Sequence, residues 1–177
     1  MSAPRPPVDL RDHITAIPDH PEPGIVFRDV TPVFAHPEAL AAAVEQLAAL
    51  TRDLDVQRVI GAEARGFLLG PALALELGAG FLLARKPGKL PRRTVAVGYD
   101  LEYGTDSLEA HADLLEPGTR VLVHDDLLAT GGTAGALCGL VEHLGGEVVA
   151  CSFLVELEAL GGRAALAPHP VHSLVRY

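Results

Sequence analysis

The sequence predicts an α/β fold, in which a mainly parallel central sheet is flanked by helices on both faces. Short apolar runs alternate along the chain with longer segments rich in leucine and alanine, and strands that alternate with helices form parallel sheets with right-handed crossovers. The run Val121–Val123 has no polar residue, as expected for a strand buried on both faces. The chain has 177 residues, of which 49% are hydrophobic, so we expect a single domain, residues 1–177.

The N-terminal region is expected to be the least regular part of the chain. Residues 1–7 are rich in proline and are expected to be frayed. Apolar residues at helical spacing favour a short helix from Val8 to Ile17. Prolines then interrupt residues 18–37, which we expect to form an irregular arm with a short extended piece at Ile25–Phe27.

From Pro37 onward, the sequence predicts regular helices and strands. Pro37 itself suits the first turn of a helix. Between Ala84 and Val121, residues from about 95 to 110 alternate in polarity, which indicates a hairpin that could act as a mobile flap. The other expected elements are helices at Pro37–Leu50, Gly66–Leu77 (begun or kinked by Pro71) and Thr133–Leu144, and strands at Val56–Ala62, Phe81–Ala84, Val121–Asp125, Glu147–Val155 and Val171–Arg176.

Three loops with chemically active residues follow predicted strands. They are Glu63–Gly66, Arg85–Lys89 and Asp125–Thr133. The carboxyl ends of parallel strands meet at one edge of the sheet, and ligands bind such sheets there. We therefore expect the three loops to lie along one edge and to form a single ligand site.

The loop after Val121–Val123 indicates which ligand this is. Gly131 and Gly132 can take positive φ and let a ligand approach the backbone closely, and the N–H groups at the start of the following helix form a concavity suited to phosphate. The two acids before the loop would repel a second anion, so hydroxyl groups or a metal-bearing part of the ligand are their expected partners. A ribose 5-phosphate fits this pattern, with contacts from Asp125, Asp126, Ala129, Thr130, Gly131, Gly132 and Thr133.

Paired acids at the end of a strand also occur in receiver domains and in metal-dependent phosphotransferases. The small, hydroxylated loop that follows the acids argues against both alternatives. His124 stands directly before the acids, and we expect it to be buried and hydrogen-bonded rather than catalytic.

The other two loops supply basic groups for a second phosphate site. In E-A-R-G-F, the Arg65 guanidinium and nearby backbone N–H groups could grip a diphosphate, and the alternative is a surface ion pair between Arg65 and Glu63. The loop Arg85–Lys89 has three cations, and the alternative is a solvated basic loop. Both loops are expected to lie beside the phosphate loop, Ala129–Thr133, and this position favours diphosphate binding.

Two further motifs are weaker when each is taken alone. Phe27, in F-R-D-V-T-P, could stack on a planar heterocycle or could belong to the core. Glu102 and Tyr103, in L-E-Y-G, place a carboxylate and a phenol in the expected flap.

Together, these motifs carry a family resemblance that extends in order from about Ile14 to Tyr177. The segments P-G-I-V-F-R-D-V-T-P, E-A-R-G-F, R-K-P-G-K-L-P, L-E-Y-G, D-D-L-L-A-T-G-G-T and L-V-E-L resemble those of the adenine phosphoribosyltransferases, a type I phosphoribosyltransferase family. The resemblance implies that adenine and 5-phosphoribosyl 1-diphosphate react to AMP and diphosphate, and that the arm at 18–37 forms a hood over the base. It also implies a homodimer and a requirement for Mg²⁺, which would be bound mainly by the substrate.

The resemblance assigns roles to individual residues. The Phe27 position matches a ring that stacks on adenine, and Glu102 matches a flap residue near the reacting purine nitrogen. His124 is a departure, since the family usually has an apolar residue there. The implied roles are adenine contacts at Val26, Phe27, Arg28 and Leu157, diphosphate contacts at Arg65, Arg85, Lys86, Lys89 and Tyr103, and catalysis by Glu102, Arg65 and Lys89.

Two other functions stay open at this point. A phosphoribosyltransferase for a different base would share all the phosphate-binding features. A non-catalytic sensor of the same sugar diphosphate is the second alternative. The chain has no room for an added helix-turn-helix domain and the flap retains Glu102 and Tyr103, which favours an enzyme over a sensor.

Charge and composition narrow the expected partners and location. The net charge of -9 offers no general attraction to nucleic acid. The N-terminus has no apolar run of signal-peptide length, and the most apolar stretch, Phe67–Ala84, is interrupted by Pro71, Glu76 and several glycines. We therefore expect a cytoplasmic protein without a membrane partner. Cys138 and Cys151 are expected to be reduced core thiols, and His169 and His172 lack the further ligands that zinc needs.

Overall fold

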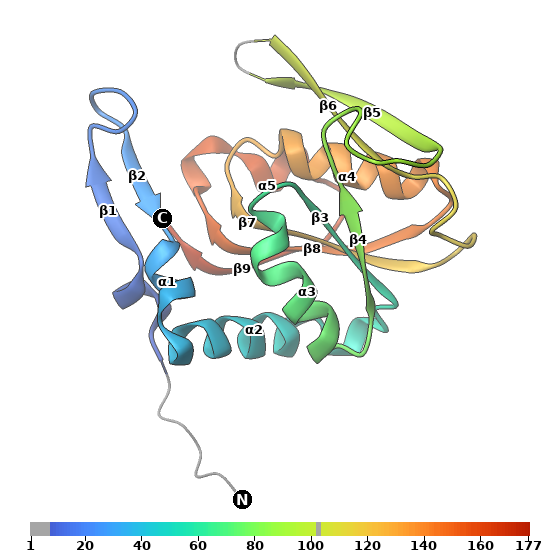
Figure 1. Ribbon diagram of the computed structural model, residues 1–177. Helices are drawn as coiled ribbons and strands as arrows, with labels where there is room; N and C mark the ends of the chain where they lie inside the picture. Colours follow the sequence, from blue (N-terminus) through green and yellow to red (C-terminus); the bar gives the residue numbers. More distant parts are fainter. Residues whose placement is uncertain (1–7, 102–103) are drawn as a thin grey trace, which may run out of the picture.

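The central element of the fold is a five-stranded sheet with the strand order β4-β3-β7-β8-β9. The computed structural model describes residues 8–101 and 104–177 (Figure 1). All neighbouring strands of this sheet run parallel, so the predicted α/β class is confirmed. The strands are β3 (Arg58–Ala62), β4 (Gly80–Ala84), β7 (Arg120–Leu128), β8 (Glu147–Glu156) and β9 (Val171–Arg176).

Helices cover both faces of the sheet (Figure 1). On one face, α2 (Pro37–Thr51) and α3 (Gly66–Glu76) bury residues such as Leu47 and Leu73 against Leu122. On the other face, α4 (Gly132–His143) packs on Val121 and Val123. Neighbouring residues of β7 thus face opposite helical layers, because side chains alternate along a strand.

The predicted N-terminal helix over 8–17 is wrong. A short 3₁₀ turn, η1 (Leu10–His13), leads into β1 (Thr15–Pro18), which pairs antiparallel with β2 (Val26–Asp29). The apolar residues at helical spacing include Ile14, which is buried in the core at the base of this hairpin. The apolar spacing is also compatible with a turn followed by a strand, and pairing of β1 with β2 decided between the two conformations.

The arm at 18–37 is more regular than predicted. It contains β2 and a short helix, α1 (Thr31–Ala35), whose first N–H group, that of Thr31, donates to the Asp29 carboxylate at 2.9 Å. Pro32 lies in the first turn of α1, where its missing N–H costs nothing. The prolines of the arm therefore separate short elements instead of excluding them.

A second hairpin is formed by β5 (Thr94–Leu101) and β6 (Gly104–His111), which pair antiparallel. This agrees with the alternating polarity at 95–110. The hairpin packs over α4, with Val97 and Tyr99 of β5 lying against the core. In Figure 1, the β1–β2 hairpin lies instead beside the end of β9, so two separate two-stranded sheets are attached to the central one.

Candidate active site

A cavity of about 140 Å³ opens between the end of β7 and the start of α4. Gly131 takes a φ of +91° immediately before α4, a conformation that glycine adopts without strain. The first N–H groups of a helix have no partner within it, so they can bind an anion here. The cavity is lined by Arg65, Asp125, Leu127, Leu128, Ala129, Thr130, Gly131, Gly132, Thr133 and Ala134.

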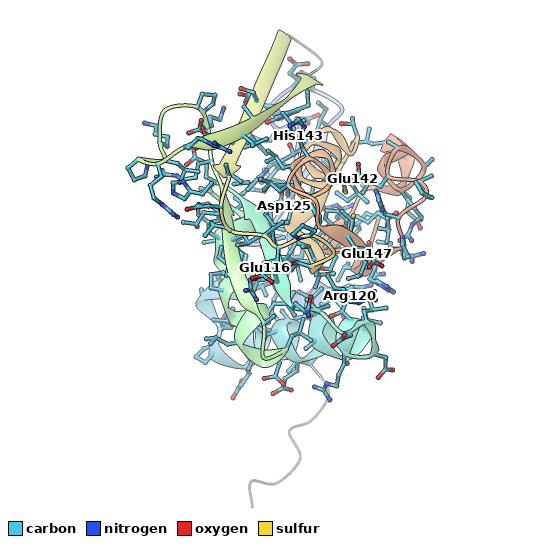
Figure 2. The ribbon with its side chains drawn as sticks, turned by 90° about the vertical axis from the view of Figure 1, so that its right-hand side faces the viewer. Glu116, Arg120, Asp125, Glu142, His143 and Glu147 are labelled. Carbon is cyan, nitrogen blue, oxygen red and sulfur yellow. The ribbon has the colours of Figure 1, made fainter. Side chains whose placement is uncertain are left out.

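Both acids lie within β7, which continues to Leu128, three residues beyond the predicted end of the strand at Asp125. Pairing of β7 with β3 ends at His124, whereas pairing with β8 continues to Leu128. Asp125 and Asp126 therefore lie where one flank of β7 has no strand beside it, which leaves room for a ligand. Figure 2 shows Asp125 in the middle of the molecule, close to α4.

The acids are poorly solvated. Asp126 is buried and Asp125 is half-buried. Burial raises the pKa of both carboxyl groups, and the Asp126 charge raises the pKa of Asp125 further, while Arg65 opposes the rise. The Arg65 Nε atom lies 3.4 Å from Asp126 Oδ2, and Asp126 Oδ1 has no hydrogen-bond partner in the described part of the chain. The pair is suited to accept hydrogen bonds from ligand hydroxyls.

The basic loop at 85–89 is tied to neighbouring acids. The Arg85 Nε atom donates to Glu63 at 2.6 Å, and the Lys86 N–H group donates to the same carboxylate at 3.1 Å. Arg85 accordingly holds the pKa of Glu63 below its ordinary value. The alternative ion pair between Glu63 and Arg65 is not formed, because Glu63 pairs with Arg85 and Arg65 with Asp126.

Lys86 also connects this loop to the second hairpin. Its Nζ atom lies 2.7 Å from Asp106 of β6, and this contact raises the pKa of Lys86 and lowers that of Asp106. The Tyr99 hydroxyl lies 3.3 Å from the same carboxylate. Lys89 is exposed. Glu102 and Tyr103, the predicted flap residues, lie outside the described residues.

The residues predicted to contact a base lie on two different elements. Phe27, in β2, is half-buried, and its ring forms a T-shaped pair with the His20 ring at a centroid distance of 5.2 Å. Val26 is 45% exposed. Leu157 follows β8, and its N–H group donates to the Leu128 carbonyl at 2.9 Å, one residue before the phosphate loop. The Arg28 guanidinium lies over the Tyr177 ring, 3.8 Å from its centroid.

Sequence relatives match the chain over nearly its full length. The adenine phosphoribosyltransferase of Rubrobacter xylanophilus is 59% identical over 169 residues, which are 95% of this chain and 91% of that protein. The enzyme of the same name from Methylococcus capsulatus is 55% identical, over 95% of this chain and 98% of its own. The chain belongs to the adenine phosphoribosyltransferase family. No family model matches it.

Solved structures agree with this assignment. The adenine phosphoribosyltransferase of Thermoanaerobacter pseudethanolicus superimposes with a TM-score of 0.91 at 47% identity, over 95% of this chain and 98% of its own. The Saccharomyces cerevisiae enzyme, solved with adenine and an imino-sugar bisphosphate, gives a TM-score of 0.87 at 37% identity, over 93% and 96%. The resemblance inferred from the motifs is thus confirmed for the family and the fold.

Several residues around the site were not singled out from the sequence. Glu109 in β6 is buried, and its carboxylate accepts from the Gly88 N–H group at 3.0 Å and from the Thr94 hydroxyl at 3.1 Å, so it holds the basic loop in place. The signal was a carboxylate at an inward position of an alternating strand. The short helix α5 (Gly162–Ala165) was also missed, because four residues carry no periodicity.

His124, the departure from the family pattern, is fully buried. Its Nδ1 atom lies 3.0 Å from the Ser152 hydroxyl, and burial lowers its pKa to about 4. The expectation of a buried, hydrogen-bonded histidine is confirmed. Cys138 and Cys151 are buried free thiols with their Sγ atoms 3.6 Å apart, which confirms the expected reduced core cysteines.

Proposed function

We propose that this chain transfers the 5-phosphoribosyl group from 5-phosphoribosyl 1-diphosphate to adenine, giving AMP and diphosphate in purine salvage. The single observation that supports this most is the cavity at the β7–α4 junction, where the loop Ala129–Thr133 meets Asp125. It combines an anion site with hydroxyl acceptors, as a ribose 5-phosphate requires. Membership in the family supplies the base and the reaction.

The proposed chemistry depends on charge that develops as diphosphate leaves. The ribose C1 atom gains oxocarbenium character, so cations at the leaving group and an aligned purine nitrogen lower the barrier. Arg65, Arg85, Lys86 and Lys89 are proposed to serve the diphosphate, together with Tyr103. Glu102 is proposed to hydrogen-bond the purine imidazole and to assist loss of its proton.

We propose Mg²⁺ as the cofactor. The acids at 125 and 126 are oxygen donors of the kind that Mg²⁺ prefers, and the Asp126 Oδ1 atom has no partner among the described residues. In the same part of the chain, no group of three or more His, Cys, Asp or Glu side chains is arranged so that it could hold a metal ion by itself. The ion would be held mainly by substrate oxygens, and when bound it would neutralise the charge of the diphosphate.

Adenine is proposed to bind between Phe27 on the hood and Leu157, directly after β8, with backbone groups of Val26 and Arg28 contacting the purine edge. Adenine offers an amino donor and a ring acceptor where a 6-oxopurine presents the reverse. Fixed backbone groups could therefore reject the wrong purine by roughly 10⁴, the factor seen where buried polar groups lose their partners.

The decisive experiment measures AMP formation from adenine and the sugar diphosphate with Mg²⁺, alongside hypoxanthine, guanine and xanthine. Of the four bases, we expect only adenine to give product at a substantial rate. A similar rate with any 6-oxopurine would instead favour a phosphoribosyltransferase of different base specificity. Formation of no nucleotide from any base, with the sugar diphosphate still bound, would favour a sensor.

We propose a homodimer in the cytoplasm. Leu68 and Leu75, seven residues apart on α3, are 51% and 81% exposed, and Leu83 on the neighbouring edge strand β4 is 42% exposed. Exposed apolar side chains gathered in this way support a protein contact. The two free thiols, Cys138 and Cys151, support a reducing compartment. In the described residues, no helix is long and apolar enough to cross a bilayer. Light scattering on Leu75→Glu tests the dimer, which this change should weaken.

A further inference from the structure

The β1–β2 hairpin has few means of holding its position. It forms a two-stranded sheet separate from the central one, and all four residues of β1 are exposed. Its base is anchored by Ile14 and Val30, which are buried in the core. Exposed hairpins of two strands are only marginally stable by themselves. Contacts between the hairpin and the sheet should therefore decide where Phe27 lies.

One such contact is made by the ring of Tyr177. The Arg28 guanidinium lies 3.8 Å from the ring centroid, and the Arg11 guanidinium of η1 lies 5.4 Å from it. Both distances fall within the range of cation–π attraction. Because side chains alternate along a strand, Arg28 and Phe27 project from opposite faces of β2. Contact of Arg28 with the ring thus determines how the Phe27 face is turned.

The backbone of Tyr177 is fixed to the opposite wall of the proposed adenine site. Its N–H group donates to the Glu156 carbonyl at 3.0 Å, and its carbonyl accepts from the Glu158 N–H group at 2.9 Å. These two partners flank Leu157 directly. Figure 1 shows the end of the chain, marked C, beside β2. A single residue thus contacts the segment that carries Leu157 and the strand that carries Phe27.

We infer that Tyr177 is a positioning residue for the purine: it sets the separation and tilt of Phe27 relative to Leu157. The inference rests on the proposed adenine site. Tyr177 does not touch the sugar-phosphate cavity, whose lining residues run from Leu127 to Ala134 with Arg65 and Asp125. Loss of the ring should therefore weaken capture of the base and leave capture of the sugar diphosphate unchanged.

The experiment compares Tyr177→Leu with Tyr177→Phe by steady-state kinetics. Leucine keeps an apolar side chain but removes the aromatic face, whereas phenylalanine keeps the face and removes only the hydroxyl. Tyr177→Leu should raise the KM for adenine by roughly two- to fivefold, the factor that corresponds to an exposed cation–π contact. Its KM for the sugar diphosphate should stay within about twofold, and Tyr177→Phe should match the parent protein.

Arg28→Ala and the double variant Arg28→Ala/Tyr177→Leu complete a cycle. If both side chains act through one contact, the double variant should have the same adenine KM as the worse single variant. Arg52→Ala serves as a control, because the Arg52–Glu76 pair joins two exposed side chains of the helical layer. Thermal midpoints of all variants separate loss of position from loss of the fold.

Two results would overturn the role of Tyr177. One is an adenine KM of Tyr177→Leu equal to that of the parent. The other is an equal rise of both KM values in the leucine and phenylalanine variants, together with a lowered thermal midpoint, which would indicate a purely structural role. A parent protein that makes no AMP from adenine would instead refute the proposed function, and with it an adenine-positioning role. A parent that is active with adenine leaves the kinetics of Tyr177→Leu to decide.

Discussion

The sugar-phosphate cavity and the two hairpins are built in opposite ways. The cavity grows out of β7, where Val121, Leu122 and Val123 are fully buried, and it ends on a 12-residue helix packed into the core. The hairpins are separate two-stranded sheets. All of β1 is exposed, whereas β6 buries Leu108 and Ala110 in the core, away from the turn that joins β5 to β6. Rigid elements hold a site with less error than attached loops do, whereas regions with few buried contacts open more easily.

This difference suggests that the cavity and the hairpins bind different parts of the substrates. Contacts to the part of the substrate that does not change, the ribose 5-phosphate, are proposed on the rigid sheet. Recognition of the base and closure over the site are proposed on the hairpins, at Phe27 and Glu102. The predictions below test whether damage to each region affects a different kinetic step.

The largest effect is expected in the flap. Glu102→Gln removes the proposed proton acceptor but keeps the size of the side chain. We expect kcat to fall by roughly 10²–10⁴-fold, as is typical for loss of general acid–base catalysis, with the KM for the sugar diphosphate almost unchanged. Steady-state kinetics with both substrates measures this. An unchanged kcat would remove Glu102 from the chemistry.

A change in the rigid region should affect sugar-diphosphate binding. A Cβ atom at Gly162 would lie 2.2 Å from the Ala129 carbonyl oxygen, so Gly162→Ala must displace the phosphate loop or α5. Misplacement of a binding group by about 1 Å can cost up to 10²-fold, and we expect the KM for the sugar diphosphate to rise at least tenfold, with a lower thermal midpoint.

A matched control for this change lies in α4. A Cβ atom at Gly135 would meet no atom within 4 Å. Gly135→Ala should therefore stabilise the helix by about 0.5–1 kcal/mol and preserve activity. If Gly162→Ala were as active as Gly135→Ala, the cavity would not be the rigid part of the site.

We expect the two acids of the cavity to lower the stability of the folded protein at neutral pH, although they serve ligand binding. Their pKa values are raised by burial, so the folded protein binds these protons more tightly than the unfolded chain. Stability is then lost as pH rises from the ordinary value near 3.8 through the raised pKa. At pH 8, Asp125→Asn should raise the thermal midpoint by roughly 2–4 °C while weakening sugar-diphosphate binding.

Thermal melts from pH 4 to pH 8 check this sign. The gap between Asp125→Asn and the parent should widen as pH rises, and it should be small near pH 4. A midpoint that falls in the variant at pH 8 would mean that the Asp125 charge is stabilising in the folded protein. Replacement of the exposed Asp53 by Asn provides a control, for which no such widening is expected.

The smallest effect is expected where the hairpin meets the basic loop. Lys86→Ala breaks the ion pair with Asp106, which is partly exposed and therefore contributes little. We expect kcat/KM for the sugar diphosphate to fall by roughly two- to fivefold, and by less at high salt, because salt screens such pairs. A loss as large as that of Gly162→Ala would place Lys86 among the main binding groups.

The sequence predicted the regular elements from Pro37 onward within a few residues, because their periodicity is local. It also predicted which loops would meet, since parallel strands bring their carboxyl ends to one edge. The N-terminal hairpin was mispredicted. Thr15–Pro18 becomes a strand only through its pairing with Val26–Asp29, which no local pattern encodes.

The sequence by itself determined the family and the type of chemistry, through glycines, acids and cations at fixed short spacings. Only the tertiary structure decided which charges meet: Arg65 pairs with Asp126, Arg85 with Glu63, and Lys86 with Asp106. It alone placed the Tyr177 ring against Arg28, across 149 positions of the chain. Spacing along the chain determines local geometry, whereas contacts between distant residues depend on how whole elements pack.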